Sequence, residues 1–62
     1  MEKLFNLKKG DKFIINDKKL EVVGWINKFM PTLGKVPNLE TKTEDGKRQL
    51  FITNFEVEKV IN

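Results

Sequence analysis

Five short segments rich in β-branched and aromatic residues alternate along this chain with segments typical of turns. Segments of this length, separated by turn residues, are typical of a small all-β barrel or sandwich. The chain has no Ala, the residue with the highest helix propensity, which agrees with a β fold. We therefore expect five strands, at 12–15, 20–29, 39–43, 48–52 and 57–61.

The segments between these strands predict how they are connected. Asp45-Gly46 lies between two alternating segments, which is a strong hairpin signal. Asn16-Asp17 predicts a second hairpin, because both residues tolerate left-handed backbone angles. Gly24 interrupts the longest apolar segment and predicts a bulge or a sharp bend. The segment 31–38, with two Pro and one Gly, predicts a long loop between the second and third strands.

Strict alternation of apolar and polar residues fails in places, so apolar side chains face both sides of the predicted sheet. We expect an N-terminal segment to cover the second face as a minor core; the alternative is a surface for an oligomer or a partner protein. The failures are at Ile14-Ile15, Val22-Val23 and Leu50-Phe51-Ile52, and the covering residues are Leu4, Phe5 and Leu7.

The C-terminal segment 54–61 fits neither the helical nor the strand period well. We expect a 3₁₀-like turn at Asn54–Glu56 followed by a final strand. A single short helix that begins at Asn54 as its N-cap is the alternative.

Two segments resemble parts of a known fold. Leu7–Ile15, with its Gly-Asp turn leading into apolar residues, is similar to the opening of SH3-like barrels, including those of the KOW type. Phe55–Val60 is similar to the short turn and final strand of the same fold. The resemblance implies a five-stranded barrel and a role in binding nucleic acid, peptides or other proteins. It transfers no active-site residues, because this fold serves many functions.

The composition argues against an enzyme. With 62 residues, the chain has room for one small domain, 1–62, and not for two. It has no Cys, His, Ser or Tyr, so the usual acid/base groups, nucleophiles and thiolate ligands are missing. We expect no catalytic residues, no metal site and no cofactor. No apolar run approaches the roughly 18 residues of a membrane span, and Met1–Phe5 does not resemble a secretory signal, so we expect a cytoplasmic protein.

The net charge of +3 is predicted to gather at one end of the barrel. A meander would bring the 8–11 turn and the 28–38 loop together, with four Lys against Asp11 and with aromatic residues beside them. Lysines that neutralise phosphates and rings that accept stacked bases are typical of single-stranded nucleic-acid binding. Low sequence specificity is expected, because Arg48 is the only Arg. The predicted contacts are Lys8, Lys9, Trp25, Lys28, Phe29, Met30 and Lys35.

Other interpretations of the same residues remain open. Trp25 is a candidate for the core, Phe29 and Met30 for a plug of the barrel end, and the Lys pairs for solvated edge protection. One alternative function is a protein-binding regulator or inhibitor of phage or plasmid type, which binds through the Phe29–Leu33 loop. A second is a homo-oligomer that binds a small ligand or nucleotide between its subunits.

Overall fold

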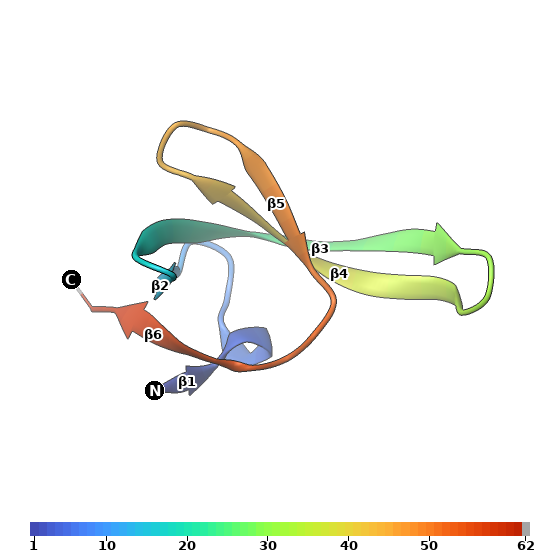
Figure 1. Cartoon of the computed structure of the whole chain (residues 1–62), viewed down its shortest axis with the longest axis horizontal. Helices are drawn as coiled ribbons and strands as arrows, with labels where there is room; N and C mark the ends of the chain where they lie inside the picture. The colour runs from blue at the N-terminus through green and yellow to red at the C-terminus, as the bar shows by residue number, and fades with distance from the viewer. Residues whose placement is uncertain (62) are drawn as a thin grey trace.

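The computed structural model describes residues 1–61 and shows one antiparallel sheet with a single turn of 3₁₀ helix (Figure 1). All five predicted strands are present, which confirms an all-β fold, and a two-residue strand precedes them. The sheet order is β1-β6-β2-β3-β4-β5, so β1 and β5 form its edges. The elements are β1 (Glu2–Lys3), η1 (Leu4–Asn6), β2 (Lys12–Ile15), β3 (Lys18–Met30), β4 (Gly34–Thr43), β5 (Arg48–Phe51) and β6 (Glu56–Val60).

Both predicted hairpins are confirmed. Asn16 and Asp17 have φ angles of 51° and 62°, as a two-residue type I′ turn requires, and they connect β2 to β3. The Asp45-Gly46 turn connects β4 to β5. There the Thr43 side chain accepts a hydrogen bond from the Lys47 backbone N–H at 3.0 Å and contacts the Asp45 carboxylate. These local signals fix the pairing of neighbouring strands.

The predicted long loop at 31–38 is wrong. β3 and β4 stay paired out to Met30 and Gly34, so the connection is only the turn 31–33. Pro37, predicted to be a loop residue, lies within β4 opposite Asn27. A proline is tolerated in a strand where its missing N–H faces an unpaired edge, and β5 pairs with β4 only at 39–42.

The core of the protein lies under the β2–β3–β4 part of the sheet and includes the N-terminal segment. Leu4 and Leu7 join the main cluster, so this segment contributes to the single core. The ring pairs Phe13–Phe51 and Phe51–Phe55, with centroids 6.1 and 5.8 Å apart, bridge the space between β5 and the segment before β6. The buried apolar residues are Leu4, Leu7, Phe13, Leu20, Val22, Leu39 and Val57.

The final strand is confirmed as β6, but the predicted 3₁₀-like turn at Asn54–Glu56 is wrong. The 3₁₀ turn is instead η1, near the N-terminus. Asn54 lies in an extended connection, where its side-chain oxygen accepts a hydrogen bond from the Phe5 backbone N–H at 3.0 Å. The Leu4 N–H also donates to the Phe55 carbonyl at 2.8 Å. These bonds hold the N-terminal segment against the chain entering β6.

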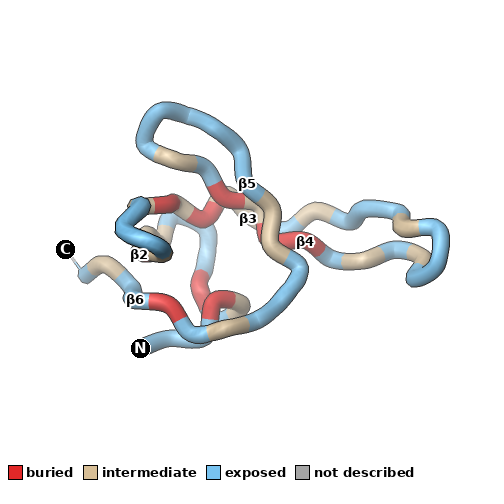
Figure 2. The backbone as a smooth tube through the Cα atoms, viewed as in Figure 1, coloured by how far each residue is buried: buried red, intermediate tan, exposed pale blue. Residues whose placement is uncertain are grey.

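A two-stranded arm projects from the body of the protein. It comprises 25–30 of β3, the turn 31–33 and 34–38 of β4, and it extends to the right in Figure 1. The predicted bulge at Gly24 is confirmed at the root of the arm: the register shifts between Val22 and Gly24, and Gly24 has a φ of 153°. Figure 2 shows that buried residues are concentrated in the body; Asn38 is the one buried residue of the arm.

Candidate binding site on the β3–β4 arm

One face of the arm carries two aromatic side chains. Because side chains alternate along a strand, Trp25, Asn27 and Phe29 point to the same side, here called the aromatic face. Trp25 is 48% exposed and Phe29 is 75% exposed. At about 3.3 Å per residue, their Cα atoms lie roughly 13 Å apart along β3. The structure therefore brings together the two rings that the sequence singled out.

Trp25 is held at the root of the arm by a ring contact with the body and by strand pairing opposite a core residue. Its ring meets Phe5 edge to face, with centroids 4.9 Å apart and an interplanar angle of 73°. Its cross-strand partner Leu39 is fully buried in the core. Trp25 is therefore neither a buried core residue nor a free side chain, because part of its ring is packed and about half remains exposed.

The tip of the arm is apolar and lies in solvent. The Leu33 N–H donates to the Met30 carbonyl at 3.1 Å, and Gly34 follows with a φ of 75°. Pro31 stands at the second position of this turn, which its fixed φ favours. Leu33 is 68% exposed. The interpretation that Phe29 and Met30 fold back to plug the barrel end is therefore wrong, because paired strands carry them away from the body.

The opposite face of the arm is more aliphatic. Ile26, Lys28 and Met30 alternate with the aromatic residues, and Val36 lies across from Lys28. Asn38 is 4% exposed, and its side-chain amide donates to the Val36 carbonyl at 2.9 Å. This bond satisfies the buried amide within β4 itself.

The arm is positively charged and has no carboxylate. No acidic residue occurs between Glu21 and Glu40, whereas Lys28 and Lys35 both lie in this interval. Glu40, the nearest acid on β4, pairs with Arg48 at 3.8 Å. Within residues 1–61, neither lysine of the arm belongs to an ion pair. Lys35 lies directly across from Phe29, so a positive charge flanks the more exposed ring.

The structure does not gather the four predicted lysines at one end. Lys8 and Lys9 lie in a turn whose Gly10 N–H donates to the Val22 carbonyl at 2.9 Å. Val22 is six residues before Lys28 on β3, which is roughly 20 Å of strand. The predicted grouping failed because the loop expected beside this turn is an arm that extends away from it. Trp25, Lys28, Phe29, Met30 and Lys35 are thus on the arm, and Lys8 and Lys9 are not.

Asp11, expected to face those lysines, is engaged within the body. Its carboxylate accepts a hydrogen bond from the Lys8 N–H at 2.8 Å and lies 3.8 Å from the Lys59 amine. The carboxylate therefore holds the turn closed and adds no negative charge to the arm.

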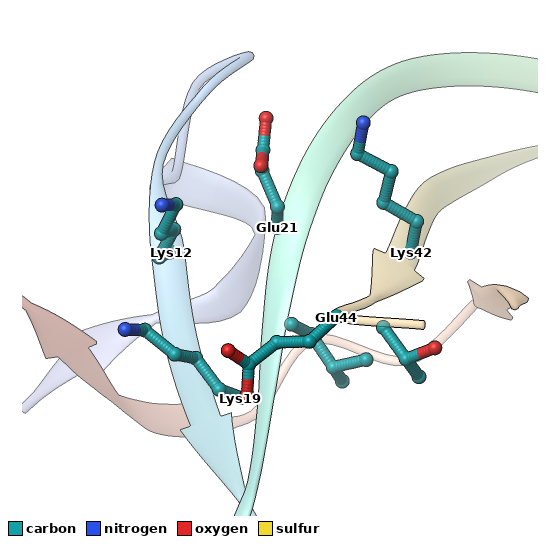
Figure 3. Close-up of a pocket in the computed structure, with 7 residues that line it drawn as sticks. Lys12, Lys19, Glu21, Lys42 and Glu44 are labelled. Atoms are coloured by element: carbon teal, nitrogen blue, oxygen red, sulfur yellow. The ribbon is translucent and has the colours of Figure 1, made fainter. Parts of the chain in front are cut away.

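A shallow pocket lies on the sheet away from the arm (Figure 3). Lys12, Glu21 and Lys42 come from three adjacent strands and lie in register across them. Glu21 therefore stands between two lysines and offsets their charge. Sequence reasoning missed this row, because only the strand register brings the three residues together. The lining residues are Lys12, Lys19, Leu20, Glu21, Lys42, Thr43 and Glu44.

Residues 1–61 contain no cluster of three or more acidic residues placed to hold a metal ion. In the same part of the chain, no helix has the length and apolar character needed to cross a membrane. Searches against protein-family models, curated proteins and solved structures found no match to this chain.

Proposed function

We propose that this protein is a non-enzymatic binding module whose arm binds single-stranded nucleic acid. The observation that carries this proposal is the placement of Trp25 and Phe29, both exposed, on one face of an arm that has no carboxylate. Aromatic rings beside positive charges are the common means of binding single strands without sequence preference.

The spacing of the rings favours an extended single strand over a duplex. Bases in a duplex repeat every 3.4 Å or so along each strand and stay stacked on one another. Rings roughly 13 Å apart instead suit bases that are separated and stacked on protein side chains. Asn27 lies between the rings and offers an amide to a base edge or sugar, while Lys35 beside Phe29 suits a phosphate.

The wider fold is consistent with a binding barrel. The proposal includes the SH3-like barrel class that the sequence resembles. It is supported by the return of β6 to pair with β2, and by Phe51 and Phe55, which meet across the open side of the sheet. In such a barrel the core sets the angle of the arm, and the arm carries the binding residues.

The test is a titration of labelled random-sequence DNA and RNA single strands, followed by anisotropy. Lys35→Glu is expected to weaken binding, whereas Lys47→Glu in the β4–β5 turn provides a matched exposed-lysine control with little effect. Equal effects of the two substitutions would show that binding follows net charge alone and would overturn the assignment to the arm.

A protein partner is the second candidate, favoured by the exposure of Phe29 and Leu33 at 75% and 68%. Exposed aromatic and aliphatic side chains on a stiff turn are typical anchors of a protein interface. A regulator or inhibitor of phage or plasmid type would use the tip, 29–33, which shares only Phe29 with the aromatic face. Leu33→Ala separates the two functions, because it removes a tip anchor and leaves both rings in place.

A further inference from the structure

One edge of the arm has unpaired backbone along β3. β2 pairs with β3 only at 18–21, and the Gly10–Asp11 turn bonds to Val22. From Trp25 to Phe29, β3 has β4 on one side. On the other side no other segment of residues 1–61 forms a backbone hydrogen bond with it. This stretch is therefore an open sheet edge.

The register shows which backbone groups point out of this edge. Thr43 donates its N–H to Lys47, so Thr43 faces β5 and not β3. In an antiparallel ladder this direction alternates, so Pro37 and Lys35 also face away from β3. Their partners Asn27 and Phe29 then direct their N–H and C=O groups away from β4. The same holds for Trp25. The three residues together therefore place three N–H donors and three C=O acceptors on the open edge.

The two edges of the arm differ in how they are protected. On β4, Pro37 has no N–H to point out of the edge, so another strand could not pair with this edge along its whole length. The β3 edge from Trp25 to Phe29 has no proline, and its one charged residue is Lys28. Exposed edges without such protection act as templates for another strand. A two-stranded ribbon is also only marginally stable by itself, so pairing would stabilise the arm.

We propose that this edge pairs with the same edge of a second copy, forming an antiparallel dimer with its two-fold axis at Asn27. In this register Trp25 of each copy lies opposite Phe29 of the other, and Ile26 lies opposite Lys28. No lysine is placed opposite a lysine, and each aromatic ring gains an aromatic partner, an arrangement that stabilises sheets. The edge is therefore complementary to itself, as a two-fold interface requires.

The dimer forms a four-stranded sheet with the order β4-β3-β3-β4. Its aromatic face carries two Trp25 and two Phe29 side chains. The dimer does not depend on the proposed function, because it is formed by backbone groups at the edge and by ring pairs across it. The Lys28 side chains of the two copies lie diagonally near each other, so added salt strengthens this association by screening them.

The experiment is sedimentation equilibrium of the full chain over a range of concentrations, with two variants at Asn27. Asn27→Pro removes the outward N–H without affecting a bond to β4, and it is expected to weaken dimerisation tenfold or more, at roughly two lost bonds per dimer. Asn27→Thr keeps the N–H and is expected to dimerise like the wild type. Circular dichroism shows whether each variant retains its β structure.

The proposal is overturned if the wild-type protein stays monomeric at about 100 μM, a concentration at which weak complexes form. It is also overturned by an Asn27→Pro variant that dimerises unchanged. If that variant does not fold, amide exchange of the wild type decides, because the Trp25, Asn27 and Phe29 amides must gain protection as concentration rises. Oligonucleotide titration of the wild-type protein keeps the two proposals apart, since a wild-type monomer that still binds single strands contradicts only the dimer.

Discussion

At the scale of single residues, the two exposed aromatic side chains have different surroundings. Trp25 rests against Phe5 and the core, whereas Phe29 has no ring partner among the described residues and is flanked by Lys35. Sequence reasoning found both residues and the charge beside them. It could not decide between core and surface for Trp25, because that depends on where the bulge at Gly24 directs the strand.

The first prediction concerns Phe29. Phe29→Ala is expected to lower single-strand affinity about fivefold or more, since one stacked base contributes about 1–3 kcal/mol. Its stability should change by less than about 0.5 kcal/mol, because the side chain is exposed. Leu33→Ala, at similar exposure, is the control in the same anisotropy titration. An equal or larger loss of single-strand affinity for Leu33→Ala would contradict stacking of a base on Phe29.

The second prediction concerns the N-terminal segment. Leu4 is fully buried, so Leu4→Ala is expected to lower the free energy of unfolding by about 2–5 kcal/mol in urea denaturation. Ile52→Ala removes a side chain that is 52% exposed and should change stability far less. Similar values for the two variants would mean that the N-terminal segment does not belong to the core.

At the scale of elements, the hairpins could be predicted and the arm could not. Asn16-Asp17 and Asp45-Gly46 are local signals, because Asn16, Asp17 and Gly46 themselves adopt the positive φ angles that the turns need. The arm depends instead on pairing between 25–30 and 34–38. Pro37 argued against a strand at 34–38, so the sequence predicted a loop there. A proline is excluded from the paired interior of a sheet but not from an edge, and the sequence alone does not show that β5 leaves the Pro37 part of β4 uncovered.

The third prediction concerns the bulge that directs the arm. Gly24→Ala is expected to destabilise the protein by about 1–3 kcal/mol through backbone strain. A Cβ there would meet no atom within 4 Å, so the φ of 153° is the only obstacle. Gly34→Asn is the control and should cost less, because Asn adopts the φ of 75° found there more readily. Thermal unfolding of both variants tests this, and an equal loss would contradict the role of the bulge.

At the scale of the whole molecule, the elongated shape separates lysines that the sequence analysis predicted to lie together. The protein measures 38 × 24 × 20 Å, and its long axis follows the arm in Figure 1. Lys8 and Lys9 stay with the body, while Lys28 and Lys35 lie on the arm. The composition gives the net charge of +3 but not where the charged side chains lie. Their distribution needed the three-dimensional arrangement.

The fourth prediction uses salt to count the lysines in contact with nucleic acid. For single strands, the slope of log affinity against log salt is about −0.7 for each neutralised phosphate. A contact by Lys35 alone, the arm lysine that shares the aromatic face, predicts a slope of about −0.7, whereas all four lysines would give about −2.8. Titrations at several salt concentrations measure this slope. A value near the steeper figure would mean that Lys8 and Lys9 also contact the strand.

The most direct test of the central claim is a fluorescence titration of Trp25, the only Trp, with random-sequence single strands at low and physiological salt. Stacking on the exposed part of its ring predicts saturable quenching that weakens as salt rises and is reduced in Phe29→Ala. No quenching up to high micromolar oligonucleotide, together with no shift in a gel assay, would contradict a nucleic-acid role for the arm.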